Sequence, residues 1–143
     1  MRELIYFAIV IFIMYIMHIL LSAKRLEKAR TFLPRKESIC RQILEEIYGL
    51  PFPNCRPDWL KNVTGHNLEL DCYNEVLKLA LEYNGEQHYL FPNFTNCSYR
   101  EFVAQQQRDA LKKKLCEGHG VKLIVVPYTV ETNDLKSFIL KAL

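Results

Sequence analysis

Residues 67 to 84 carry two alternations of period two, and this pattern limits the fold more than any other feature of the chain. Apolar side chains occupy every second position in both segments: Leu68, Leu70 and Cys72 in "NLELDCY", and Leu79, Leu81 and Tyr83 in "KLALEYN". Successive side chains of a strand point to opposite faces, so each segment predicts a strand with one apolar face. The short connection around residues 74 to 77 predicts that the two strands form a hairpin.

Acids occupy the opposite faces of the two predicted strands. With a turn of about four to six residues, Asp71 and Glu82 come nearly abreast, and Asn84 follows Glu82 on the same face. Two neighbouring carboxylates repel each other unless a cation lies between them, so the pair indicates oxygen ligands suited to Mg²⁺ or Mn²⁺. An exposed sheet face with solvated acids is the alternative, and the spacing alone leaves both interpretations open.

Further elements flank the hairpin. "KESICRQILEEIYG" has the apolar stripe of a helix that ends at Gly49, and residues 98 to 120 predict a long helix that ends in glycine. "VKLIVV" predicts a buried strand that Pro127 stops, and residues 131 to 143 predict a C-terminal helix. The order is helix, strand, strand, helix, strand, helix. It indicates an α/β fold in which helices pack on a mixed sheet.

"LELDCYN…LKLALEYNGEQHY…QQQRDALKKKLCEGHGVKLIVVPY", taken with this order, resembles the PD-(D/E)xK nuclease superfamily. Within it, the chain is most similar to the very-short-patch-repair-like branch and to small nucleases of large DNA viruses. The resemblance covers about residues 36 to 130 and implies a restriction-endonuclease-like core, a mixed β-sheet flanked by helices. The resemblance implies that Asp71 is the central metal-binding aspartate and Glu82 the second acid. It also implies that Glu37 is the helix acid that completes the coordination sphere of Mg²⁺ or Mn²⁺.

The chain departs from the family pattern where the family usually has lysine. Asn84 stands there, and an amide neither carries a positive charge nor acts as a base near neutral pH. Related branches combine a residue other than lysine with a downstream histidine. This implies that His88 shares the catalytic work and that Gln87 helps to position water, whereas a purely structural histidine at a strand end is the alternative.

The resemblance also implies contacts with nucleic acid. "QxxRDxxK" occurs with the same spacing in the resembling proteins, which gives three candidates for backbone or active-site contacts: Gln105, Arg108 and Lys112. A solvated basic helix face is the alternative, and we expect Asp109 to pair with a neighbouring base. In "RPDWL", Arg56 is a candidate phosphate contact, and Trp59 is interpreted as a core anchor, with a stacking platform for bases as the alternative. The aromatic segment "YLFPNF" either lines a nucleic-acid groove or closes the core.

Residues 4 to 23 contain no Lys, Arg, Asp or Glu, and a helix of this length spans about 30 Å of hydrocarbon. We therefore predict a membrane helix, with a cleaved signal peptide or a buried core helix as alternatives. Six bases in residues 24 to 36 predict that the rest of the chain faces the cytoplasm. The predicted organisation is a transmembrane anchor (1–23), a basic linker (24–36) and a nuclease-like domain (37–143). Five cysteines without a CxxC pair favour reduced thiols.

Together these features predict a membrane-anchored, Mg²⁺-dependent or Mn²⁺-dependent endonuclease that hydrolyses DNA, with RNA as a further substrate to consider. The alternative is a catalytically inactive membrane protein that keeps the nuclease fold as a nucleic-acid-binding or scaffold module. A homodimer is left open, because a small nuclease often needs two active sites to cut both strands. The resemblance further implies a virus-encoded protein that associates with a host membrane or the virion.

Overall fold

The computed structural model describes residues 11–22 and 35–143, and the chain divides into two compact units, Met1–Pro34 and Arg35–Leu143. In the first unit, residues 11–22 form a helix with exposed apolar side chains. The rest of the predicted anchor and residues 24–34 of the predicted linker lie outside the described residues. Within the described ranges, no helix has the length and apolar character needed to cross a membrane.

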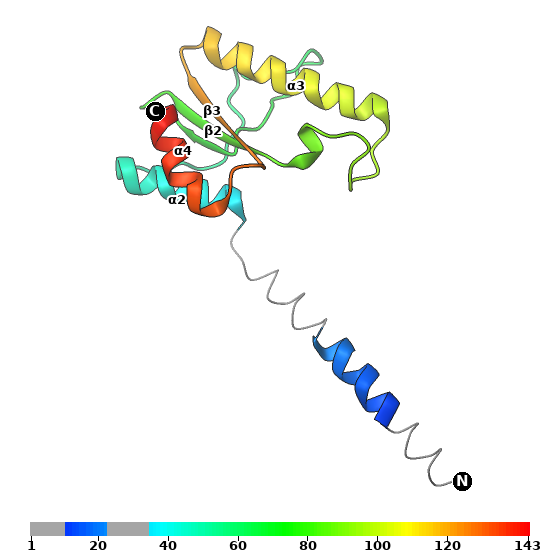
Figure 1. Ribbon diagram of the computed structural model, residues 1–143. Helices are drawn as coiled ribbons and strands as arrows, with labels where there is room; N and C mark the ends of the chain where they lie inside the picture. The colour runs from blue at the N-terminus through cyan, green and yellow to red at the C-terminus, as the bar shows by residue number, and fades with distance from the viewer. Residues whose placement is uncertain (1–10, 23–34) are drawn as a thin grey trace, which may run out of the picture. The chain divides into compact units, whose positions relative to one another are not determined.

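The second unit has the predicted α/β class and the predicted order of elements. Its elements are α2 (Lys36–Tyr48), β1 (Cys72–Asn74), β2 (Leu79–Asn84), η1 (Glu86–His88), α3 (Tyr99–Gly118), β3 (Lys122–Pro127), η2 (Thr132–Asp134) and α4 (Leu135–Ala142). The strands form a sheet in the order β1-β2-β3, with β1 antiparallel and β3 parallel to β2. In Figure 1, α3 lies on one side of β2 and β3, and α2 and α4 lie on the other. The result is a mixed sheet between two helical layers.

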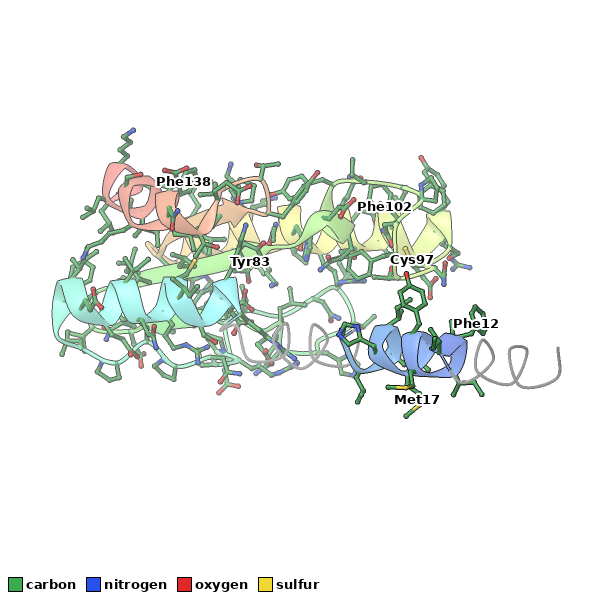
Figure 2. All side chains as sticks on the ribbon, turned by 60° about the horizontal axis from the view of Figure 1, so that its bottom comes forward. Phe12, Met17, Tyr83, Cys97, Phe102 and Phe138 are labelled. Carbon is green, nitrogen blue, oxygen red and sulfur yellow. The ribbon has the colours of Figure 1, made fainter. Side chains whose placement is uncertain are left out.

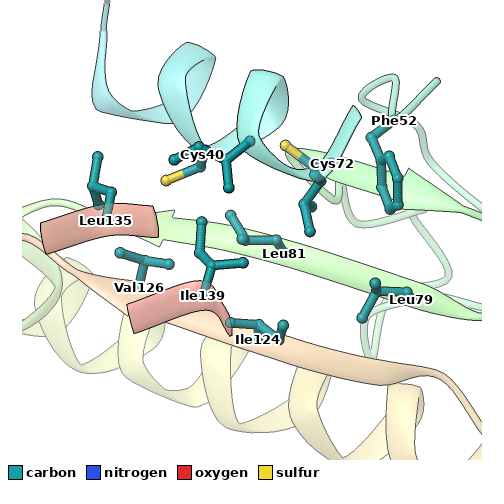
Figure 3. Close-up of a cluster of buried hydrophobic side chains, with 11 residues drawn as sticks. Cys40, Phe52, Cys72, Leu79, Leu81, Ile124, Val126, Leu135 and Ile139 are labelled. Atoms are coloured by element: carbon teal, nitrogen blue, oxygen red, sulfur yellow. The ribbon is translucent and has the colours of Figure 1, made fainter. Parts of the chain in front are cut away.

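The main core lies between the sheet and the helices α2 and α4 (Figure 3). Its buried members are all apolar or cysteine: Cys40, Ile43, Leu44, Phe52, Cys72, Leu79, Leu81, Ile124, Val126, Leu135 and Ile139. The strands β2 and β3 contribute alternate residues to this core, as the period of two predicts. A smaller core under α3 contains Leu60, Leu68, Leu70, Tyr73, Ala80, Cys116 and Val121.

The first predicted strand is shorter than its alternation indicates. Only Cys72–Asn74 pairs with β2, while residues 67 and 70 form isolated bridges with residues 61 and 55. The chain bends at Asp71, so Leu70 packs under α3 and Cys72 packs in the main core. The prediction that both side chains share one face was therefore wrong, because the bend interrupts the alternation.

The first residue of the unit's first helix connects that helix to the far end of the sheet. Lys36 Nζ donates hydrogen bonds to the backbone oxygens of Tyr128 (3.2 Å) and Val130 (2.7 Å), just after β3. Lys36 was assigned to the linker from the sequence, but it belongs structurally to this unit. The helix ends at Gly49, whose φ of 63° is the left-handed conformation that glycine adopts without strain.

All five cysteines are free thiols, as predicted. Burial raises the pKa of Cys40 to about 12 and the pKa values of Cys72 and Cys116 to about 11 each. These three side chains therefore stay protonated near neutral pH and act as small apolar core residues.

Candidate functional site

Asp71 and Glu82 lie side by side at one end of the β1–β2 pair. The register pairs Cys72 with Leu81, and continuing it by one residue places Asp71 opposite Glu82. Asp71 Oδ2 accepts a hydrogen bond of 3.1 Å from the backbone N–H of Tyr83, which fixes the aspartate against β2. The two acids therefore lie near each other, as predicted, although Asp71 stands at the bend and outside the β1–β2 ladder.

Glu82 is a charged side chain placed where packing alone would favour an apolar one. It is 4% exposed and points to the α3 side of the sheet, between the core residue Ala80 and the buried Asn84. Burial raises the pKa of its carboxyl group, the neighbouring Asp71 and Asp109 raise it further, and Lys112 opposes the shift. A buried carboxylate of this kind is costly without a cation beside it.

Lys112 provides a cation for this carboxylate. Its Nζ forms a short ion pair with Glu82 Oε1, and both side chains are largely buried. Lys112 reaches the sheet because it lies on the inward face of α3. That face follows the helical spacing of three and four residues and comprises Phe102, Gln105, Asp109, Lys112 and Cys116.

The same helix face supplies a partner for His88. The distance between His88 Nδ1 and Asp109 Oδ2 is 2.7 Å, and both side chains are mostly shielded from solvent. His88 reaches α3 because the one-turn helix η1 follows directly after β2. Asp109 thus pairs with a neighbouring basic residue, as expected, and that residue is His88.

Asn84 and Gln87 also lie at this end of β2. Asn84 is buried on the face that carries Glu82, opposite Pro127 of β3. The amide of Gln87 folds back over Gly85, so closely that a Cβ added at position 85 would meet Gln87 Oε1. Glycine at position 85 therefore allows the close approach of Gln87 to the end of the strand.

Glu37 is connected to Asp71 through a residue that the sequence analysis did not single out. Arg41 Nη2 donates to Glu37 Oε1 (3.2 Å) and to the backbone oxygen of Asp71 (2.7 Å). Among the residues that the structure describes, no three His, Cys, Asp or Glu side chains are grouped so that they could hold a metal ion. The geometry therefore groups Asp71 with Glu82 and leaves Glu37 bound to Arg41.

The other predicted nucleic-acid contacts are distributed over the surface. Arg108 is exposed on α3, and Gln105 is half-buried on the inward face of that helix. Arg56 Nη2 pairs with Glu69 Oε2 at 2.8 Å, beside a surface hollow of about 630 Å³ that Trp59 and the β1–β2 turn also line. Trp59 packs against the core under α3 and stacks on His119, with the two ring centres 4.6 Å apart, so its role as a core anchor is confirmed.

The spacing of the sequence contained a signal for Asp109 and for the pairing of Arg41 with Glu37, four residues before it, but none for the contact of Arg41 with Asp71. Asp109 falls on the row of residues 102, 105, 109, 112 and 116, which a helical projection of α3 would place together. Arg41 reaches Asp71 across 30 positions of sequence, and no local pattern indicates such a contact.

The assembled group has defined chemical capacities. Two carboxylates supply oxygen ligands for a hard cation, a buried lysine supplies a fixed positive charge, and a histidine supplies a nitrogen that a carboxylate orients. No nucleophilic cysteine is present in this group, because the buried thiols stay protonated in the cores.

Comparison with known proteins finds viral relatives. The chain is 45% identical over 106 residues to the uncharacterized protein 033L of Invertebrate iridescent virus 3, covering 73% of this chain and 55% of the relative. It is 45% identical over 111 residues to the uncharacterized protein 307L of Invertebrate iridescent virus 6, covering 66% of this chain and 56% of the relative. It is 39% identical over 109 residues to the uncharacterized protein 094L of Frog virus 3, covering 75% of this chain and 69% of the relative.

The chain spans about half the length of the first two relatives. The viral origin of all three is consistent with the expectation that this chain is virus-encoded. No family model and no solved structure matches the chain.

Proposed function

We propose that this chain, which belongs to the same protein family as protein 094L of Frog virus 3, is a metal-dependent nuclease that hydrolyses phosphodiester bonds in DNA. The observation that carries the proposal is the burial of Glu82 abreast of Asp71 on a sheet face where an apolar side chain would pack better. A buried carboxyl group with a raised pKa that meets a lysine, as Glu82 does, is typical of catalytic sites. The mixed sheet between helices is compatible with the restriction-endonuclease-like core that we assign as part of this proposal.

Asp71 and Glu82 are the residues that we assign to a divalent cation. Their donor chemistry fits Mg²⁺ or Mn²⁺, because both supply carboxylate oxygens, Asp71 from directly before β1 and Glu82 from β2, and Glu82 is buried where a cation would offset its charge. A bound cation of this kind stabilises charge on a phosphoryl oxygen and lowers the pKa of a bound water. Glu37 remains a candidate third ligand, although its carboxylate contacts Arg41 in this structure.

We assign to Lys112 the role of the positive charge that the family's lysine supplies and that Asn84 cannot supply. It comes from α3 rather than from β2, but its ammonium group reaches the Glu82 carboxylate. A fixed positive charge in a shielded site stabilises the negative charge that develops on phosphate during hydrolysis. We expect Lys112→Ala to slow cleavage by about a hundredfold, whereas Lys113→Ala, on the exposed side of α3, leaves it unchanged.

His88 is the residue that we assign to proton transfer. With its proton on Nδ1, His88 donates to Asp109, and this contact leaves Nε2 able to accept a proton from an attacking water. Asp109 acts as a positioning residue, because it fixes the tautomer and the orientation of the ring. Asn84 and Gln87 are amides at the same end of β2 and can orient water or phosphate.

The decisive experiment is cleavage of labelled single- and double-stranded DNA and of RNA by the full chain in detergent, with Mg²⁺, with Mn²⁺ and with chelator. Asp71→Asn and Glu82→Gln are compared with Glu75→Gln, a control in the exposed β1–β2 turn. We expect metal-dependent cleavage that falls at least about a thousandfold in the two site variants and is retained by the control. Equal cleavage by all four proteins would exclude the assigned site.

A second candidate function is supported by one specific observation. Asn84 replaces the lysine of the family pattern, and the Lys112 ion pair already satisfies the buried Glu82. A catalytically inactive module that binds nucleic acid or serves as a scaffold would show this arrangement. Folded protein that binds DNA without cleaving it, with Asp71→Asn binding equally well, would favour this candidate over the nuclease.

Membrane attachment through residues 4–23, with the C-terminal domain on the cytoplasmic side, is a separate part of the proposal. It is supported by the charge-free apolar run and by the bases that follow it. Full-length protein that resists alkaline extraction from membranes, beside a variant lacking residues 1–23 that is released, would support the anchor. Release of both proteins would exclude it.

A further inference from the structure

Four exposed aromatic side chains gather between η1 and the first turn of α3. They are Tyr89 (42% exposed), Phe91 (42%), Phe94 (72%) and Tyr99 (64%), and together we call them the aromatic platform. Isolated exposed apolar residues are common on protein surfaces, but a group of large rings usually marks a binding surface.

The platform rests on buried or half-buried rings. Phe91 packs against the buried Phe102 with ring centres 5.7 Å apart, and it meets the edge of Tyr99 at 5.4 Å. Tyr89 packs against Tyr128, after β3, at 5.8 Å. Figure 2 shows Phe102 and Cys97 at the end of α3 where this loop joins the helix. Tyr89, Phe91 and Tyr99 are therefore anchored to the fold through ring contacts, while Phe94 is the most exposed ring of the same loop.

The loop that carries the platform is held by its own polar groups. Asn93 Nδ2 donates to the backbone oxygen of Leu90 at 3.0 Å, and Asn93 Oδ1 accepts from the backbone N–H of Thr95 at 3.0 Å. Ser98 and Glu101 then close the loop with a capping box at the start of α3. Because these contacts hold the loop before any ligand binds, binding costs less conformational entropy.

The charge around the platform favours an anionic ligand with flat apolar groups. Residues 89 to 100 contain no Asp or Glu, and Arg100 adds a positive charge. The nearest acid in sequence, Glu101, accepts hydrogen bonds from Ser98 and is committed to the helix cap. Nucleic acid combines a phosphate backbone with flat bases that stack on aromatic rings.

The platform is continuous with the candidate catalytic group. Tyr89 directly follows His88, and Phe102 lies seven residues before Asp109 on the inward face of α3. At about 1.5 Å per residue, this places the anchor of the platform roughly 10 Å along the helix from the His88–Asp109 pair. A strand whose bases lie on the platform would bring its backbone toward this pair.

We propose that the aromatic platform binds unpaired bases of single-stranded nucleic acid by stacking. This inference rests on the proposed function, because it assigns the substrate's bases to a surface beside the catalytic group. It makes single-stranded segments, rather than intact duplex, the preferred substrate, since bases in a duplex are already stacked on each other.

The test measures binding without cleavage. Fluorescence anisotropy follows a labelled oligothymidylate with the full chain in detergent and chelator, and an abasic strand of equal length serves as the comparison ligand. The variants are Phe94→Ala, Phe94→Leu and Phe94→Trp, since Phe94 is the most exposed ring of the platform. Val76→Ala, at an 88% exposed position in the β1–β2 turn, is the matched control.

We expect Phe94→Ala and Phe94→Leu to weaken binding of oligothymidylate about tenfold, while Phe94→Trp and Val76→Ala retain it. The abasic strand binds weakly and does not respond to the substitutions. Affinity that is the same for all four variants overturns the proposal. Loss of vesicle binding in Phe94→Ala, with unchanged binding of oligothymidylate, also overturns it and assigns the platform to a lipid surface.

This readout separates the two proposals, because it needs neither metal nor turnover. If Phe94→Ala weakens binding but the wild-type chain cleaves nothing, the base-stacking proposal is supported and the nuclease proposal is excluded. If cleavage depends on Asp71 and Glu82 but binding does not change in the Phe94 variants, the nuclease proposal is supported and the base-stacking proposal is excluded.

Discussion

The two faces of β2 are built differently, although they come from the same six residues. Leu79, Leu81 and Tyr83 face α2 and α4 and pack in or against a core of apolar and cysteine side chains. Ala80, Glu82 and Asn84 face α3, where only Ala80 joins an apolar core. One face thus buries carbon and sulfur, and the other buries a carboxylate and an amide beside a lysine.

This difference separates stability from function within one strand. Burying apolar area stabilises the fold, whereas burying a carboxylate costs free energy that the ion pair with Lys112 offsets only in part. A protein under selection for stability alone would pack leucine or valine at position 82. The buried polar residues on the α3 face, Glu82 and Asn84, are therefore better explained by function than by stability.

The largest expected effect on stability is on the apolar face. Leu81→Ala removes a fully buried side chain from the main core, and we expect the free energy of unfolding to fall by about 3 kcal/mol. Denaturant unfolding of the full chain in detergent measures it. Leu140→Ala, at an exposed position of α4, should change stability by no more than about 0.5 kcal/mol. A small effect of Leu81→Ala would contradict the division of roles between the faces.

A smaller effect is expected on the polar face. Lys112→Ala leaves the buried Glu82 without its cation, and we expect a loss of about 2 kcal/mol near neutral pH, measured by the same unfolding experiment. The loss stays below that of Leu81→Ala because Lys112→Ala removes no side chain from either apolar core. Lys113→Ala is the matched control on the exposed side of α3. Equal stability of both lysine variants would show that the ion pair contributes nothing.

The sequence predicted the apolar face better than the polar one. The period of two placed Leu79 and Leu81 correctly, and the helical stripe of α4 placed Leu135 and Ile139 in the core. These predictions succeed because burial repeats with the geometry of the element. The bend at Asp71 was missed, since a single hydrogen bond to Tyr83 N and bridges to distant residues redirect the chain there.

The candidate site was predicted only in part, because local geometry follows from the sequence pattern and contacts between distant residues do not. Asp71 and Glu82 were placed together because a hairpin is a local structure whose register follows from the turn. The contacts of Arg41 with the backbone of Asp71 and of His88 with Asp109 depend on how helices dock on the sheet. Docking sets distances between residues far apart in sequence, which spacing does not encode.

The helices on the two faces should also differ in their dependence on capping. The long helix α3 buries only Phe102 and Cys116, and it begins with a capping box, whereas α2 buries three residues and has no side-chain cap. We expect Ser98→Ala to cost about 1 kcal/mol, measured by unfolding. Ser38→Ala, at an exposed position of α2, tests the other face and should cost less than about 0.5 kcal/mol. Equal costs would show that packing, not the cap, holds the start of α3.

The smallest effect is a difference in pH dependence between the two faces. Burial raises the pKa of Glu82 above its ordinary value of 4.5, so the native state keeps this proton to a higher pH than the unfolded state does. The stability contributed by that proton is fully present below pH 4.5 and is lost as the pH rises through the raised pKa. Glu82→Gln removes this contribution, because an amide does not titrate.

We therefore expect the difference in Tm, Glu82→Gln minus wild type, to become more positive as the pH rises through this window in the presence of chelator. The corresponding difference for Leu81→Ala should change little, since the substitution removes no titratable group. Thermal unfolding across the acid range measures both series. A difference for Glu82→Gln that becomes more negative with rising pH would mean that Lys112 holds the pKa of Glu82 below its ordinary value. In that case the polar face would be stabilised by its charges, and the contrast between the two faces of β2 would disappear.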